Sequence, residues 1–264
     1  METYDLIGTN YNITRQADPR ITRAIIRALD LPQSSTIVDI GAGTGNYSVE
    51  LAHAGFHVHA VEPSTLMRQQ GQQHPDLHWH PAVAEALPFA DASVDGIVCT
   101  MAVHHFRDIK QSFSEMVRIT RDHGPLVLFV ADPRLCPQDC WLADYFQPIF
   151  HRSYEVYLSL EELQHLLSDA AGSPVDVQIF LLPHDLADHF FLSGWRSPER
   201  YLEPAFRQGI SPLASAPATV VDPCLQRLAH DLKSGIWQTT YGSLLTQQAY
   251  DGGYRFLVTH KQAK

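Results

Sequence analysis

Three alternating glycines constrain the fold of this chain more than any other feature. Gly41, Gly43 and Gly45 follow directly after residues 36–40, a β-branched run that reads TIVDI. A helical pattern begins at once behind them, at residue 46. Glycine has no Cβ, so these positions can adopt positive φ and let a ligand approach the backbone closely. A strand, a tight glycine turn and a helix in this order are typical of the nucleotide-binding unit of open α/β folds.

The spacing of these glycines separates two classes of nucleotide. The turn reads G-x-G-x-G, whereas a dinucleotide fingerprint reads G-x-G-x-x-G. The stretch 36–46 resembles the first motif, V-D-I-G-x-G-x-G, of the class I S-adenosyl-L-methionine (SAM)-dependent methyltransferases, in particular their small-molecule, UbiE-like branch. In that family the loop wraps the methionine and ribose part of SAM. The resemblance therefore implies that Gly41, Ala42 and Gly43 contact this cofactor.

An acidic residue ends the next predicted strand. Residues 57–61 read as a strand, and Glu62 follows about one βα unit after the glycines, where a carboxylate can accept the ribose hydroxyls. Ser64 is predicted to cap the following helix, with Met67 on its first turns. Together with the resemblance, this pattern places Glu62, Pro63 and Met67 at the cofactor.

Later segments carry the same resemblance. Residues 82–89 look like the family segment A-E-x-L-P-F, which edges the adenine, and imply that Ala84 and Glu85 lie there. Residues 91–97 resemble D-x-S-F-D-x-V, with a valine where phenylalanine is usual. The strand after them ends at Thr100 and Met101. Because ligands of open α/β sheets lie outside the carboxyl ends of the strands, both residues are expected near SAM.

The N-terminal segment resembles a lead-in, Y-x-x-x-R, that covers SAM as a lid in many small methyltransferases. Tyr11 and Arg15 occupy its two fixed positions. The resemblance implies that Tyr11 lies against the cofactor and that Arg15 pairs with its carboxylate, a charge-assisted contact. A frayed terminus with a surface arginine is the alternative interpretation.

Alternating strands and helices over residues 36–132 predict an α/β fold with parallel strands and right-handed crossovers. We expect a doubly wound, Rossmann-like, mostly parallel seven-stranded sheet in which residues 253–259 form an antiparallel edge strand. Residues 183–250 do not fit a crossover and are interpreted as a helical cap insertion. The predicted units are a lid and first helix (1–35), a SAM-binding core (36–182), the cap (183–250) and the last core strand (251–264).

The composition limits the classes of partner that the protein is expected to bind. The chain carries 19 Lys and Arg against 29 Asp and Glu, a net charge of −10, and no basic block, which argues against nucleic-acid binding. It contains no apolar run of the roughly 18 residues that a membrane span needs, and its start lacks the pattern of a signal peptide. Its four dispersed cysteines fit a cytoplasmic protein. No His or Cys spacing supplies the converging ligands of a metal site. The oligomeric state is left open.

The chemistry that SAM binding implies requires few catalytic groups. The sulfonium methyl is already electrophilic, so the protein has to align a nucleophile and, for some acceptors, remove a proton. The candidate bases are His105, His184 and Tyr154, with His151 and Asp185 as further options. The predicted function is in-line transfer of the methyl group to a small organic acceptor.

Other functions are compatible with the same motifs. A cyclase, a lyase or an aminocarboxypropyl transferase would use SAM at a different sulfonium carbon. A nicotinamide-dependent oxidoreductase would bind a dinucleotide at the glycine turn, and a SAM-binding module would have no turnover. The identity of the product nucleotide separates the first group from a methyltransferase.

Overall fold

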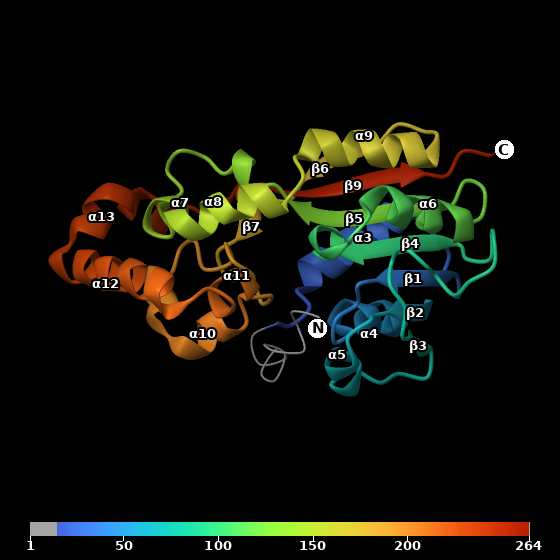
Figure 1. Ribbon diagram of the computed structural model, residues 1–264, viewed down its shortest axis with the longest axis horizontal. Helices are drawn as coiled ribbons and strands as arrows, with labels where there is room; N and C mark the ends of the chain where they lie inside the picture. The colour runs from blue at the N-terminus through green and yellow to red at the C-terminus, as the bar shows by residue number, and fades with distance from the viewer. Residues whose placement is uncertain (1–14, 264) are drawn as a thin grey trace.

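Within residues 15–263, the part of the chain that the computed structural model describes, the central sheet has seven strands in the order β3-β2-β1-β4-β5-β9-β6 (Figure 1). They are β1 (Thr36–Ile40), β2 (His57–Val61), β3 (Leu77–His80), β4 (Gly96–Thr100), β5 (Pro125–Ala131), β6 (Asp176–Ile179) and β9 (Tyr254–His260). The predicted doubly wound, mostly parallel α/β sheet is confirmed.

The antiparallel strand is where the sequence prediction needs a correction. β9 pairs antiparallel with β5, as expected, but β6 pairs with its other side. The edge position predicted for residues 253–259 is therefore wrong, and β6 forms the edge. The burial of the two strands agrees with this order: β9 is buried from Tyr254 to Thr259, whereas Ile179 of β6 is 61% exposed.

Helices cover both faces of the sheet because successive strand residues point to opposite sides. Ile37 of β1 packs with Ile21 and Leu51, which belong to helices on one face. Val38, its neighbour in the strand, packs with Phe113 and other residues of the opposite layer. The core helices are α3 (Pro19–Leu29), α4 (Asn46–His53), α5 (Thr65–Gln69), α6 (Ile109–Ile119) and α9 (Leu160–Ala171). Helices α3 and α4 lie on the first face, and α6 and α9 on the second.

Local signals determine where the core helices begin. Asp18 caps α3 and Pro19 occupies its first position, where a missing N–H costs nothing. Ser159 and Glu162 form the predicted capping box of α9, each accepting a hydrogen bond from the other's backbone. Asp108 caps α6 through the N–H of Gln111.

A second group of helices stands beyond the strand ends at the left of Figure 1. These helices are α7 (Trp141–Tyr145), α8 (Gln147–Val156), α10 (Pro204–Gln208), α11 (Ser211–Ala214), α12 (Ala218–Ser234) and α13 (Ile236–Tyr241). Short 3-10 turns complete the chain: η2 (Val103–His105), η3 (Pro133–Leu135), η4 (Pro198–Leu202) and η5 (Gly242–Thr246). The two-stranded pair β7 (Leu182–Pro183) and β8 (Ala249–Tyr250) joins the points where the chain enters and leaves this region.

Buried aromatic residues hold this cap together. Trp141 of α7 packs edge-on against Tyr201 and Trp237, with ring centroids 5.1 and 5.8 Å away, and its indole N–H donates to the carbonyl of Trp195 at 2.7 Å. Because α7 precedes the predicted insertion, we propose that residues 133–157 join residues 183–250 in one cap.

Helix α12 contains a proline. It starts at Ala218 and includes Pro223. This proline is in the second turn, where it removes a single backbone hydrogen bond. Burial of Val221 and Cys224 against the cap core supports a helix here despite the proline.

No helix in residues 15–263 is long and apolar enough to cross a membrane.

Candidate active site

The glycine turn joins β1 to α4 and needs glycine for two different reasons. All three glycines have positive φ, at +71° for Gly41, +59° for Gly43 and +74° for Gly45. A Cβ on Gly41 would lie 2.4 Å from the Cβ of Ala102, whereas a Cβ on Gly43 would meet nothing within 4 Å. Gly41 thus permits close packing of two loops, and Gly43 borders open space.

Glu62, at the end of β2, is tied to this turn. Its carboxylate accepts the backbone N–H of Gly43 at 3.0 Å and that of Ser64 at 2.8 Å, and the residue is 7% exposed. Ser64 in turn caps α5. A carboxylate offers about four acceptor sites, more than these two backbone bonds use. The acid is therefore held rigidly beside the glycine turn while it lines a cavity.

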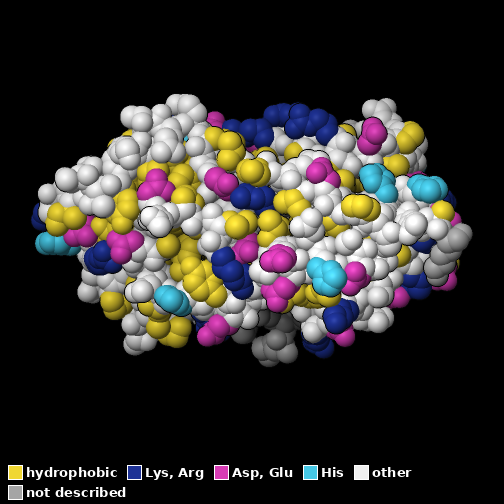
Figure 2. All heavy atoms as spheres, turned by 90° about the horizontal axis from the view of Figure 1, so that it is seen from above, with side chains coloured by type: hydrophobic (Ala, Val, Ile, Leu, Met, Phe, Trp, Pro, Cys, Tyr) yellow, Lys and Arg dark blue, Asp and Glu magenta, His cyan; other side chains and the backbone are white. Residues whose placement is uncertain are grey.

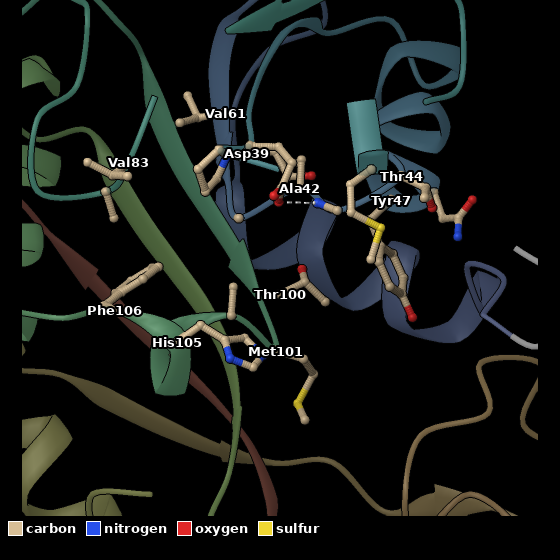
Figure 3. A pocket seen from close by; sticks show the side chains of 18 of the residues that line it. Asp39, Ala42, Thr44, Tyr47, Val61, Val83, Thr100, Met101, His105 and Phe106 are labelled. Carbon is tan, nitrogen blue, oxygen red and sulfur yellow. Dashed lines mark hydrogen bonds between the residues drawn. The ribbon is translucent and has the colours of Figure 1, made fainter. Parts of the chain in front are cut away.

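That first cavity, of about 120 Å³, lies at the carboxyl ends of β1, β2 and β4. Figure 3 shows Thr100, Met101 and His105 on one side of it, facing the glycine turn and Tyr47. The predicted cofactor residues that line it are Arg15, Gly41, Ala42, Gly43, Glu62, Pro63, Met67, Ala84, Glu85, Thr100 and Met101. Tyr11, the remaining prediction, lies outside the described residues.

Glu85 lines the first cavity, as the resemblance implies, and also holds a neighbouring loop. Its carboxylate accepts the backbone N–H groups of Arg107 and Asp108, at 2.7 and 3.1 Å. These bonds fix the loop after η2 against residues 82–89. The side chain therefore orders the cavity wall.

Two lining residues of the first cavity with buried, unpartnered oxygens were not among the predicted site residues. Asp39 of β1 is 2% exposed; its Oδ2 accepts the hydroxyl of Ser48 at 2.5 Å, and its Oδ1 is buried with no partner in the described chain. Burial raises the pKa of this carboxyl to about 6. The hydroxyl of Thr44 is likewise buried and unpartnered among residues 15–263. Buried polar atoms without partners mark a place for a polar ligand. The sequence signal for Asp39 was a single acid in an apolar strand.

Arg15 connects the first cavity to the cap. Its guanidinium donates to both carboxylate oxygens of Asp188, at 2.5 and 3.3 Å, and Tyr47 donates its hydroxyl to the same carboxylate at 3.0 Å. Asp188 is 2% exposed, so this pair is held with little water. The predicted contact of Arg15 with a ligand carboxylate uses the same side chain, which carries five donors.

A second cavity, of about 370 Å³, lies between the strand ends and the cap. Arg15, Met101 and His105 line both cavities. The other lining residues come from η2, α8, the cap loops, α12 and β9: His104, Pro148, Ile149, Arg152, Ser153, Val156, Tyr157, Phe190, Phe191, Ile210, Ser211, Pro212, Ser215, Ala216, Pro217, Val220 and Tyr254. The two cavities therefore meet at Met101 and His105.

Met101 is held in a strained backbone conformation at that junction. Its φ is +52°, which is uncommon for a residue with a side chain. The hydrogen bond from its N–H to the carbonyl of Phe129, at 2.8 Å, fixes the conformation. Strain of this kind costs on the order of 1–3 kcal/mol and clusters at functional sites.

His105 is the candidate base that the structure brings to the junction. Its side chain is exposed and lines both cavities, and partial desolvation by the cavity walls, together with the positive charge of Arg15, lowers its pKa to about 4. The imidazole is therefore neutral at pH 7 and can accept a proton. His104, the other histidine of η2, stacks on Tyr157 with centroids 4.4 Å apart. Burial lowers its pKa well below the usual value.

The structure does not bring the other two candidate bases to the cavities. Tyr154 is 38% exposed, and its ring contacts Arg134 and His151. His184 is exposed at the end of β7, where its backbone pairs with Gln248. Neither lines a cavity with His105, so neither is retained as a catalytic candidate. Asp185 is also remote, since its carboxylate pairs with Arg20 at 2.6 Å.

Comparison with known proteins agrees with this geometry. A family model described as a methyltransferase domain matches residues 38–128, from β1 into β5. A crystallised protein of Anabaena variabilis, assigned as a methyltransferase from an antibiotic biosynthesis pathway, is 46% identical, covers 93% of this chain and 98% of its own, and superposes with a TM-score of 0.90. The chain belongs to the class I SAM-dependent methyltransferases.

More distant relatives of this methyltransferase have curated activities. A demethylmenaquinone methyltransferase of Beutenbergia cavernae is 29% identical over 73% of this chain and 81% of the relative. O-methyltransferase cnsE of Penicillium expansum is 31% identical over 60% of this chain and 59% of the relative. With other demethylmenaquinone methyltransferases the match spans 55–56% of the relative, just over half of its length.

SAM is the cofactor of this enzyme, and the residues of the first cavity fit it. Glu62 offers a carboxylate suited to sugar hydroxyls. Asp39 offers a buried, unpartnered carboxylate oxygen suited to an ammonium group. The open space at Gly43 lets a ligand lie against the backbone. Thr44 and Thr100 add buried hydroxyls with no partner among residues 15–263.

Proposed function

We propose that this methyltransferase transfers the sulfonium methyl group of SAM directly to a small organic acceptor bound in the second cavity. One observation carries the proposal: a cavity that fits SAM and a larger cavity under the cap share Arg15, Met101 and His105. A nucleophile in the second cavity can therefore approach the junction from the side opposite the cofactor, as in-line displacement requires.

We further propose which part of the cofactor each residue of the first cavity contacts. Glu62 accepts the ribose hydroxyls, Asp39 accepts the ammonium group, and Arg15 pairs with the carboxylate. Backbone of the turn at Gly41, Ala42 and Gly43 lies along the ligand. Pro63 and Met67 on one side, and Ala84 and Glu85 on the other, enclose the nucleoside.

At the junction, the protein's contribution is to orient the acceptor, exclude water and accept a proton. SAM supplies an electrophilic methyl group, so no covalent nucleophile on the enzyme is needed. As the acceptor oxygen or nitrogen forms its bond to carbon, its proton becomes acidic, and the neutral imidazole of His105 can take it. The cap keeps bulk water from competing. The products are the methylated acceptor and S-adenosylhomocysteine.

The nature of the acceptor follows from the cavity and the relatives. The second cavity is largely apolar, which suits a small organic molecule. The Beutenbergia relative is named for methylation of demethylmenaquinone, a small organic molecule, and the Penicillium relative is named an O-methyltransferase, which supports an oxygen acceptor. On the face seen in Figure 2, one group of basic side chains lies at the upper middle edge, and basic and acidic side chains are mixed over the rest of the face.

The product nucleotide tests the proposal. The enzyme is incubated with SAM and a panel of biphenyl compounds that differ only in the terminal nucleophile: hydroxyl, amine, thiol or carboxylate. We expect mass spectrometry to detect S-adenosylhomocysteine together with a methylated biphenyl, above a control without acceptor. Formation of methylthioadenosine would instead indicate a cyclase, lyase or aminocarboxypropyl transferase. Calorimetric binding of NAD(H) but not of SAM would contradict the proposal altogether.

A further inference from the structure

The charges around the second cavity differ from those of the chain as a whole. The protein has ten more carboxylates than Lys and Arg side chains, with a net charge of −10. Nevertheless, no described residue that lines the second cavity is Asp or Glu, and its charged lining residues are Arg15 and Arg152. Although the protein is acidic overall, the described lining of the second cavity contains no negatively charged side chain.

The two arginines are not equivalent. Arg15 is neutralised by Asp188 at 2.5 Å and lines both cavities. Arg152, on the exposed side of α8, has no ion pair and no side-chain hydrogen bond with any residue in 15–263. It lines the second cavity but not the first. The uncompensated positive charge therefore belongs to the wall of the second cavity that the first cavity does not share.

Apart from the two arginines, the lining of the second cavity is mainly apolar. Ile149 of α8, Phe190 and Phe191 of the cap loop, and Pro212 and Val220 near α12 contribute to it. Phe190 also stacks on Tyr254 of β9, with centroids 4.5 Å apart, so part of this wall is flat and rigid. Such a surface suits an apolar, planar body between two polar ends.

We propose, building on the proposed function, that the acceptor is an elongated, mainly apolar molecule with one anionic group, such as a carboxylate, remote from the atom that is methylated. Arg152 binds the anionic group through charge-assisted hydrogen bonds, and the opposite end reaches His105. The same arrangement disfavours cationic amines, because the uncompensated guanidinium of Arg152 lines the cavity and no carboxylate among residues 15–263 does.

Binding of three matched probes tests this assignment without turnover. Each is a rod-shaped hydroxybiphenyl whose far end carries a carboxylate, a carboxamide or an aminomethyl group, and each is titrated into the protein saturated with S-adenosylhomocysteine. We expect the carboxylate to bind about tenfold more tightly than the carboxamide, since hydrogen bonds to ions are the stronger ones. The ammonium probe is expected to bind most weakly, and added salt to weaken only the carboxylate.

Charge variants assign the preference to one side chain. Arg152→Gln is expected to abolish the difference between carboxylate and carboxamide, and Arg152→Lys to retain part of it. Arg23→Gln is the matched control, because Arg23 is exposed on α3 and lines neither cavity. It removes the same charge from the protein and is expected to leave the preference unchanged.

Equal affinities for carboxylate and carboxamide in the wild type, a preference that survives Arg152→Gln, or failure of all three probes to bind would each overturn the anionic-acceptor proposal. Binding of S-adenosylhomocysteine is measured separately for every variant. Its absence in the wild type would refute the proposed function, whereas normal cofactor binding without anion preference would refute only the assignment of the acceptor.

Discussion

Gly43→Val is expected to weaken SAM binding about a hundredfold, or about 2.7 kcal/mol. The added side chain has open space around it in the protein, with nothing within 4 Å of the Cβ position. It therefore meets no protein atom and instead occupies part of the first cavity. Valine at the φ of +59° also strains the turn, at a cost of about 1–3 kcal/mol in stability. Isothermal titration calorimetry with SAM measures the loss.

Gly235→Val is the control variant that separates steric blocking of SAM from backbone strain at a positive φ. Gly235 has a φ of +81° and likewise nothing within 4 Å of its Cβ position, but it joins α12 to α13 in the cap and lines neither cavity. The control is expected to lower the melting temperature by a similar amount and to leave the Kd for SAM unchanged. Normal SAM binding by Gly43→Val, or equal losses in both variants, would contradict the proposed path of the cofactor along the turn.

His105→Ala is expected to lower kcat about a hundredfold, the lower end of the range for loss of a general base. The Kd for SAM is expected to change little, because His105 is proposed to act on the acceptor. Steady-state kinetics with an acceptor identified by its methylated product measures kcat. His184→Ala is the matched control: it removes an exposed histidine of the cap region and is expected to retain full activity.

The pH profile gives a second readout of the same role. The pKa of His105 is lowered to about 4 from the usual 6.5, so the base form persists well below neutral pH. The acid limb of kcat/KM is expected near pH 4 and to disappear in His105→Ala. An acid limb near 6.5, or unchanged kcat in the variant, would rule out His105 as the base.

Low pH also lowers the stability of the folded state, and the lowered pKa values of two histidines explain the direction of this effect. Desolvation lowers the pKa of His59 as well as that of His105 to about 4. Each therefore binds protons more readily in the unfolded chain. Their contribution to stability is complete above pH 6.5 and declines as the pH falls toward 4. The kinetic profile is accordingly read only where circular dichroism shows the fold intact.

Local sequence signals were sufficient for the core of the protein. The glycine turn needs only its own residues and the strand before it, and the capping box at Ser159 and Glu162 is a contact within one helical turn. Strand β2 and Glu62 follow from the spacing of a single βα unit. These features determine the position of the first cavity, so half of its lining could be predicted from the sequence.

Features that depend on long-range packing could not be predicted. The place of β9 inside the sheet depends on β6, about 80 residues earlier in the chain. The proposed cap combines segments on both sides of β6, which are in contact through Trp141, Tyr201 and Trp237. Periodicity also could not reveal that Asp39 has one unpartnered oxygen, or that Tyr154 lies on the outer side of α8.

A crystal structure of the enzyme with S-adenosylhomocysteine tests the central claim most directly. The proposal predicts the ribose hydroxyls on Glu62, the amino group on Asp39, and the thioether sulfur facing the second cavity between Met101 and His105. A nucleoside bound elsewhere, with the space at Gly43 empty, or a sulfur turned away from the second cavity, would contradict it.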